Sequence, residues 1–207
     1  MVKIFLETQN DRTPEYWFFK TLLVRLGIKS DAYDIVPVGG KDKLFNATNT
    51  NLMVVNTLEE GRNVVIFDAD TEDNCGGYRA RSSEILSERD RMGVDFELFL
   101  MPDNSEDGDF ETVIDAIARK DLHKDFFDCF TGYEMCIAGH LGADGTPKYE
   151  TPNQKAKLYA YITSMRMSNT KRNKAKSGNW LFDNSEYWDI DSPTLEPLKS
   201  FLLSCFK

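Results

Sequence analysis

The chain has 207 residues, of which 41% are hydrophobic and 12% aromatic, and its formal net charge is -9. This is enough apolar material for a substantial core, and no apolar run approaches the roughly 18 residues that a membrane-spanning helix needs. The N-terminal run reaches an acid, Glu7, too early for a secretory signal, which indicates a cytoplasmic protein.

Four apolar runs rich in β-branched and aromatic residues predict buried strands. They cover Val2–Leu6, Tyr33–Val38, Asn63–Phe67 and Asp95–Met101. Helical signals separate them. Thr13 and Pro14 predict the start of a helix that ends at Gly27. Gly93 is expected to end a charged helix over Arg79–Met92.

Two further helices are expected in this part of the chain. A crossover over Leu44–Leu58 carries a helical apolar pattern, although the asparagines between positions 46 and 51 weaken it. Asp109 is the expected cap of a helix that begins at Phe110.

This alternation of strands and helices predicts an α/β fold with a Rossmann-like, parallel central sheet of about four strands and helices on both faces. Residues 1–120 would form this α/β domain, which also carries the candidate metal-binding residues. Residues 121–207 would form a mainly helical extension packed on it as one structural unit, including helices in Pro152–Met167 and Leu195–Phe206.

The third strand is followed by three acids at alternate positions, Asp68, Asp70 and Glu72. On an extended chain these side chains point the same way. Two carboxylates about 4 Å apart repel by roughly 4 kcal/mol at an effective dielectric near 20, so the acids predict a bound cation. Oxygen ligands of this kind suit Mg²⁺ or Mn²⁺.

Glu7 strengthens this interpretation because it ends the first strand, at the edge where ligands bind in open α/β sheets. A lone Asp-x-Asp would more often cap the following helix. Glu111 lies one turn into the fourth helix, where it faces either solvent or the metal.

The motif order resembles a TOPRIM domain of the overcoming-lysogenization-defect (OLD) type. It consists of Ile4-Phe5-Leu6-Glu7, Val36–Gly40, Ile66–Asp70, Leu100-Met101-Pro102 and Gly108–Glu111, within residues 1–120. The resemblance implies Mg²⁺ held by Glu7, Asp68 and Asp70, with Glu111 helping to hold a second ion. It also implies cleavage of nucleic acid, or a related phosphoryl transfer, by a stand-alone TOPRIM protein.

Two positions depart from the family pattern: Thr8 replaces a common glycine, and Glu72 replaces an aspartate of the topoisomerase form. No tyrosine-bearing topoisomerase domain is recognisable. Gly39-Gly40-Lys41-Asp42 lacks the first glycine and the Ser or Thr of a Walker loop, so we expect no attached ATPase.

The charge is uneven along the chain. Residues 151–182 contain no acid and contribute +7 to a chain of net charge -9, which leaves -16 for the rest. Lys155 resembles the lysine that OLD-type nucleases carry after their acidic motifs. A possible DNA or RNA contact involves Lys171, Arg172, Lys174 and Lys176, with Trp180 stacking on a base. The alternative is a solvated lysine-rich loop with Trp180 in the core.

Three other interpretations stay open. A haloacid-dehalogenase-like phosphatase would use Asp68 as its nucleophile, although Glu72 stands where that pattern has Thr or Val. An inactive TOPRIM scaffold would serve as an interaction module with a protein partner. The four cysteines are expected to be reduced, and Cys129, Cys136 and His140 are a weak match to a zinc site.

Overall fold

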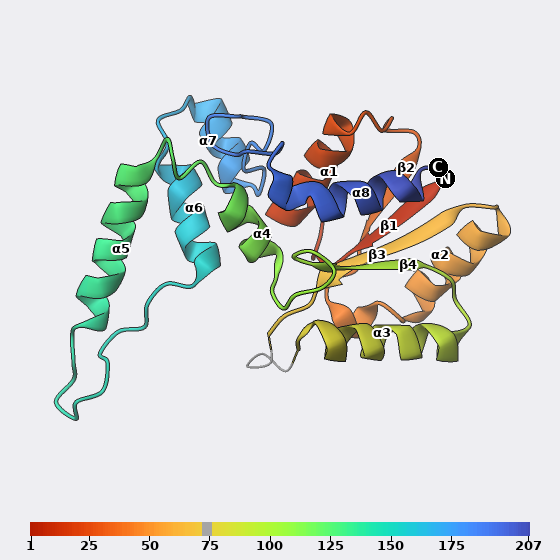
Figure 1. Ribbon diagram of the computed structural model, residues 1–207, viewed down its shortest axis with the longest axis horizontal. Coiled ribbons are helices and arrows are strands. Elements are labelled where there is room, and N and C mark those ends of the chain that lie inside the picture. Colours follow the sequence, from red (N-terminus) through yellow and green to blue (C-terminus); the bar gives the residue numbers. More distant parts are fainter. Residues whose placement is uncertain (72–75) are drawn as a thin grey trace.

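The computed structural model describes residues 1–71 and 76–207 and has a four-stranded parallel sheet (Figure 1). The strands are β1 (Val2–Leu6), β2 (Tyr33–Pro37), β3 (Arg62–Asp68) and β4 (Glu97–Met101), in the spatial order β2-β1-β3-β4. The predicted α/β class and parallel sheet are therefore confirmed, and each strand lies within two residues of its expected bounds.

The strand order reverses between β1 and β3. From β1 the chain moves outward to β2 and then returns past β1 to form β3. In open parallel sheets this switch point opens a crevice beyond the carboxyl ends of the two strands. Leu6 pairs with Ile66 in the register, so β1 and β3 end almost level with each other.

Helices α1 (Pro14–Arg25), α2 (Ala47–Leu58), α3 (Tyr78–Met92) and α4 (Phe110–Ile117) follow the four strands. Thr13 and Asp109 cap α1 and α4 as expected, and Gly93 ends α3 with a left-handed φ of 64°. The asparagine before α2 supports that helix, since the Asn46 side chain accepts a hydrogen bond from the Asn49 amide at 2.8 Å. A short 3₁₀ turn, η1 (Lys41–Lys43), precedes it.

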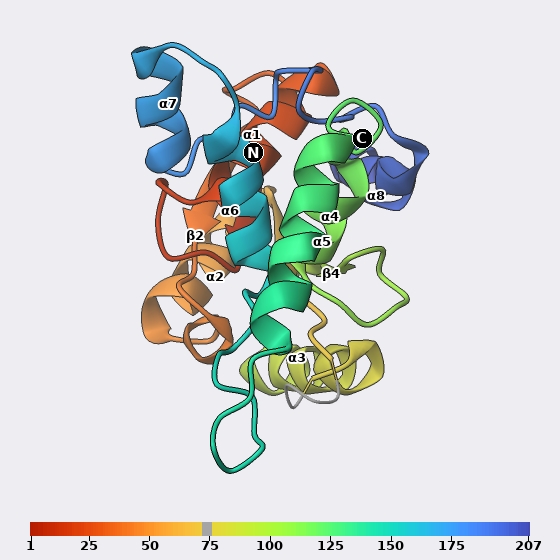
Figure 2. The same ribbon diagram turned by 90° about the vertical axis from the view of Figure 1, so that its left-hand side faces the viewer.

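Four more helices follow residue 120: α5 (Lys124–Ala138), α6 (Gln154–Ser164), α7 (Asn169–Lys176) and α8 (Glu196–Cys205), with a 3₁₀ turn, η3 (Pro193–Leu195), before the last. The extension is thus mainly helical, as expected. Figure 1 shows helix α5 and the loop after it projecting away from the sheet, and in Figure 2 the same loop extends below the rest of the chain.

Each face of the sheet packs against its own set of helices. On one face, Ile4 and Ile66 pack with α1 and α8, and on the other Phe5 and Phe67 pack with α2 and α3. The first core continues into the extension, where Tyr161 and Trp188 are fully buried. The extension therefore shares a core with the sheet. No helix within residues 1–71 and 76–207 is long and apolar enough to cross a membrane.

The end of α7 is pinned against the loop before α1 at Gly178. A Cβ atom at this position would lie 2.1 Å from the Arg12 carbonyl oxygen, and the φ of +90° is unfavourable for other residues. Only glycine allows this close approach.

We expect Gly178→Ala to destabilise the protein by clearly more than Gly27→Ala. Gly27 also has a positive φ, +76°, but its added Cβ would meet no described atom within 4 Å. Gly27→Ala isolates the backbone cost of about 1–2 kcal/mol, and Gly178→Ala adds a steric clash. Urea unfolding of both variants measures the difference, and equal losses would show that the two segments are not in contact.

Candidate functional site

Two carboxylates lie at the switch point of the sheet. Glu7 directly follows β1 and Asp68 is the last residue of β3. The Asp68 amide donates a hydrogen bond to Glu7 Oε2 at 3.2 Å, and the Phe110 amide donates one to Asp68 Oδ1 at 2.9 Å. These bonds connect the ends of β1 and β3 to the first turn of α4.

Both carboxyl groups have pKa values above their ordinary ones. Burial raises the pKa of Asp68 well above 3.8, and the nearby charges of Glu7 and Glu111 raise it further. Burial also raises the pKa of Glu7, although the hydrogen bond from the Asp68 amide partly offsets this. The site therefore holds more negative charge than its surroundings stabilise, and a cation would relieve it.

The expectation that the chain stays extended through Asp70, with the acids pointing the same way, is wrong. Asp70 has a left-handed φ of 59°, so the alternating pattern ends at Asp68. The Asp70 backbone instead pairs with Gly108, through N–H···O distances of 2.7 and 2.9 Å. The charge of Asp70 still raises the pKa of Glu7 and Asp68. Glu72, the third acid of the pattern, lies outside the described residues.

Asp70 forms an ion pair with Arg81 of α3, which the sequence analysis did not identify. The Arg81 side chain is only 4% exposed, and its Nη1 lies 3.1 Å from Glu84 Oε2. Its Nε is buried without a hydrogen-bond partner in the described part of the chain. A sequence signal existed, because Arg81 is one turn into the helix that follows the acids.

Lys155 of α6 reaches the same edge of the sheet from the opposite side. Its Nζ lies 2.9 Å from Glu111 Oε1 and 3.0 Å from Glu15 Oε1. Burial lowers the pKa of Lys155, but the hydrogen bond to Glu111 and the charges of both glutamates outweigh this and raise it. Lys155 therefore stays protonated beside Glu111.

These side chains line an open pocket of about 360 Å³. The Lys155 ammonium and the carboxylates of Glu7, Asp68 and Glu111 share it. The remaining lining residues come from the loop before α1, from the start of α1 and from Gly40; they are Thr8, Gln9, Arg12, Thr13, Pro14 and Glu15. The pocket is large enough for a hydrated ion and part of a ligand.

The donor set fits Mg²⁺ or Mn²⁺ rather than zinc. No three Asp, Glu, His or Cys side chains among residues 1–71 and 76–207 are grouped closely enough to hold an ion by themselves. Mg²⁺ is usually held by one or two carboxylates and completes its shell with water, which Glu7 and Asp68 can satisfy. Among the described residues, neither Cys129, Cys136 and His140 nor the expected three-acid set Glu7, Asp68 and Asp70 forms such a group.

The basic residues of α7 divide into two kinds. Lys171, Lys174 and Lys176 are exposed. Arg172 donates hydrogen bonds to the carbonyl groups of Thr163 and Met165, at 2.9 and 3.3 Å, and so caps the end of α6. Its guanidinium holds two helices together.

Trp180 belongs to the core. It is 3% exposed, and its ring stacks on Trp188 with an interplanar angle of 10°. Its carbonyl group accepts a hydrogen bond from the Trp188 indole at 2.7 Å. The suggestion that Trp180 stacks on a base is wrong, and the packed alternative is correct.

We expect Asp68→Asn to stabilise the protein in EDTA at neutral pH. An unfolded aspartate ionises near pH 3.9, whereas folded Asp68 holds its proton to higher pH, so stability falls as pH rises through this window. Asparagine removes the charge and can still accept the Phe110 hydrogen bond. Each pKa unit is worth about 1.4 kcal/mol, or roughly 3–5 °C in Tm.

Asp103→Asn is the matched control. Burial raises the pKa of Asp103, but hydrogen bonds from the amides of Glu106 and Ser105 outweigh it and lower the pKa. This variant should lose stability at neutral pH. Thermal unfolding between pH 3 and pH 8 measures whether each variant gains or loses stability as predicted. A destabilised Asp68→Asn protein would contradict the electrostatic account.

Comparison with known proteins identifies a family but no activity. No curated protein and no solved structure gave a match. The family model described as "Protein of unknown function (DUF3226)" matches residues 2–207, and the chain therefore belongs to that family.

Proposed function

We propose that this protein catalyses Mg²⁺-dependent, nuclease-like phosphoryl transfer on nucleic acid at a TOPRIM-type acidic site. The observation that carries the proposal is the pair Glu7 and Asp68. Both carboxyl groups have raised pKa values, lie at the switch point of a parallel sheet and open into a pocket. The TOPRIM-like order of the motifs around this pair also supports it.

In this proposal Glu7 and Asp68 hold the ion, and Glu111 contributes from the start of α4. A bound Mg²⁺ would lower the pKa of a water molecule and polarise a phosphoryl oxygen. The Asp68 carboxylate is held by the Phe110 amide, so it is fixed before a ligand arrives. The raised pKa of Glu7 moves this carboxyl toward the range in which a group can give or take a proton during catalysis.

Lys155 supplies the positive charge. It is held between Glu111 and Glu15 on the wall of the pocket, with half of its side chain exposed. From this position its ammonium group can approach a phosphate oxygen on which negative charge develops. Electrostatic stabilisation of this kind is often among the largest contributions to catalysis.

The protein should cleave plasmid DNA or RNA in Mg²⁺ or Mn²⁺, and Asp68→Asn should lower the rate at least about 100-fold, as expected when a preorganised electrostatic group is lost. Gel assays of purified protein measure the rate. Asp31→Asn removes an exposed carboxylate before β2 and serves as a control. If Asp68→Asn cleaves as fast as the control, this site is not catalytic.

An inactive TOPRIM scaffold is the second candidate, and a specific observation favours it. Arg81 already pairs with Asp70, and Lys155 already pairs with Glu111. Two of the acids are thus neutralised by the protein itself. Such a protein would fold without metal and would act through its surface.

Metal binding distinguishes the two candidates. If the site takes Mn²⁺, a concentration 100 times the Kd should stabilise the protein by about 2.7 kcal/mol. For a chain of this size the Tm should rise by roughly 5–10 °C, and Glu7→Gln should remove most of the rise. Thermal shift assays with Mn²⁺ and EDTA measure it, and an unchanged Tm would favour the scaffold.

A further inference from the structure

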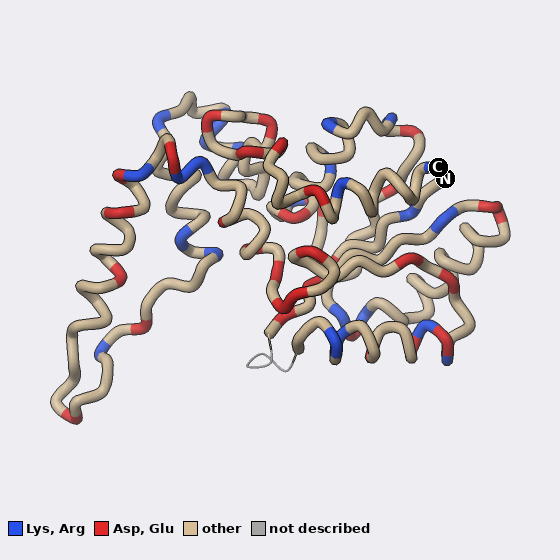
Figure 3. The backbone as a smooth tube through the Cα atoms, viewed as in Figure 1, with Lys and Arg blue, Asp and Glu red and all other residues tan. Residues whose placement is uncertain are grey.

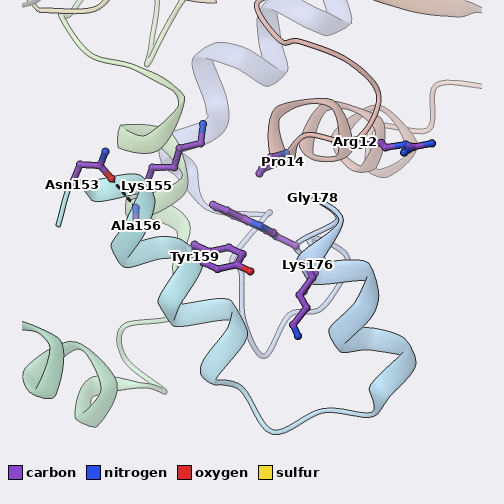
Figure 4. A pocket seen from close by; sticks show the side chains of 10 residues that line it. Arg12, Pro14, Asn153, Lys155, Ala156, Tyr159, Lys176 and Gly178 are labelled. Carbon is purple, nitrogen blue, oxygen red and sulfur yellow. Dashed lines mark hydrogen bonds between the residues drawn. The ribbon is translucent and has the colours of Figure 1, made fainter.

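A second hollow adjoins the acidic pocket. This groove has a volume of about 470 Å³ and lies between α6, the end of α7 and the loop before α1 (Figure 4). Arg12, Pro14 and Lys155 line both the groove and the acidic pocket, so the two hollows are direct neighbours. Ligand sites commonly have volumes of about 300–1,000 Å³.

An exposed aromatic ring contributes to the lining of the groove. Tyr159 of α6 is 43% exposed, although it lies beside the buried Trp180. In Figure 4, Tyr159 and Pro14 approach the same hollow from α6 and α1. Small residues, Ala156, Ala175 and Gly178, leave room beside the ring. An exposed aromatic ring in an open groove can stack on a nucleic-acid base.

The charge around the groove is positive. Arg12 and Lys176 are exposed at its edge, and α6 and α7 both lie in the segment that lacks acids. Figure 3 shows Lys and Arg on these helices, while Asp and Glu surround the loop between β4 and α4. A protein whose remaining residues carry -16 would repel a polyanion elsewhere. The groove is therefore electrostatically complementary to a phosphate backbone.

The position of the groove is fixed by packing. Gly178 lies against the Arg12 backbone, and Arg172 binds the end of α6, so α7 is held to both neighbouring walls. Lys155 then forms the junction, because its Nζ faces Glu111 in the acidic pocket while the residue also lines the groove.

We propose that this groove binds a single-stranded segment of nucleic acid, with one base stacked on Tyr159 and its phosphates along Arg12, Lys176 and Lys155. The strand would lead past Lys155 into the acidic pocket. Stacking on Tyr159 requires an unpaired base, which favours a single strand over a duplex. The proposal deepens the proposed function by naming the substrate form, but the binding itself needs no metal.

The test is binding of a fluorescein-labelled 12-nucleotide oligo(dT) to the full chain in EDTA, measured by fluorescence anisotropy. Tyr159→Ala should weaken binding by about 5- to 150-fold, the range expected for one stacked base, whereas Tyr159→Phe should bind as the natural protein does. Arg12→Ala and Lys176→Ala should each reduce the salt dependence, by a slope of about 0.7 for one phosphate contact on a single strand.

Two control variants match these substitutions. Tyr133→Ala removes a tyrosine of α5 that is 50% exposed, and Lys29→Ala removes an exposed lysine after α1. Both should bind oligo(dT) normally. The inference is overturned if Tyr159→Ala binds like Tyr133→Ala, if a duplex of the same length binds as tightly as the single strand, or if no oligonucleotide binds at low salt.

Failure of the groove and failure of the catalytic proposal give different results. If oligo(dT) binds through Tyr159 but no metal supports cleavage, the proposed binding role of the groove is supported and the catalytic proposal is rejected. The opposite result is that Asp68 is required for cleavage but Tyr159→Ala changes neither the binding of oligo(dT) nor the KM for a single strand. In that case the binding role of the groove is rejected and the catalytic role of the acidic site is supported.

Discussion

The hydrogen bond from the Asp68 amide to the Glu7 carboxylate is the contact around which the site is arranged. It depends on the pairing of β1 and β3, whose ends lie almost level at the switch point. Two carboxyl groups are thereby held in a partly buried position that raises the pKa of each. This costs free energy in the absence of a cation, and the surrounding helices can be understood from the charges that they bring to this point.

Each of the two layers of helices supplies one basic side chain that pairs with an acid at this edge of the sheet. Helix α3, on one face of the sheet, places Arg81 against Asp70. Helix α6, which joins the core of the other face, places Lys155 against Glu111. Glu7 and Asp68 remain between these ion pairs and open into the pocket. The arrangement separates acids that the protein neutralises itself from the two acids that would hold the proposed metal ion.

The helical extension therefore contributes to the site as well as to the core. It supplies Lys155 to the acidic pocket and most of the residues that line the neighbouring groove. Its aromatic residues have different roles: Trp180 and Trp188 stack in the interior, whereas Tyr159 stays exposed in the groove that Trp180 also lines. A chain with an acidic body can thus present a basic, partly aromatic surface next to its acids, where a polyanion could be guided toward them.

The sequence by itself determined the alternation of strands and helices, the parallel sheet and the position of Glu7 and Asp68 at strand ends. These features follow from local signals, namely apolar runs, caps such as Thr13 and Asp109, and the glycine stop at Gly93. Only the tertiary structure decided the conformation of Asp70, whose left-handed φ accompanies its pairing with Gly108, a residue 38 positions away. It also decided the partners of Arg81, the capping role of Arg172 and the burial of Trp180. Long-range packing selects among side-chain roles that composition and spacing leave equivalent.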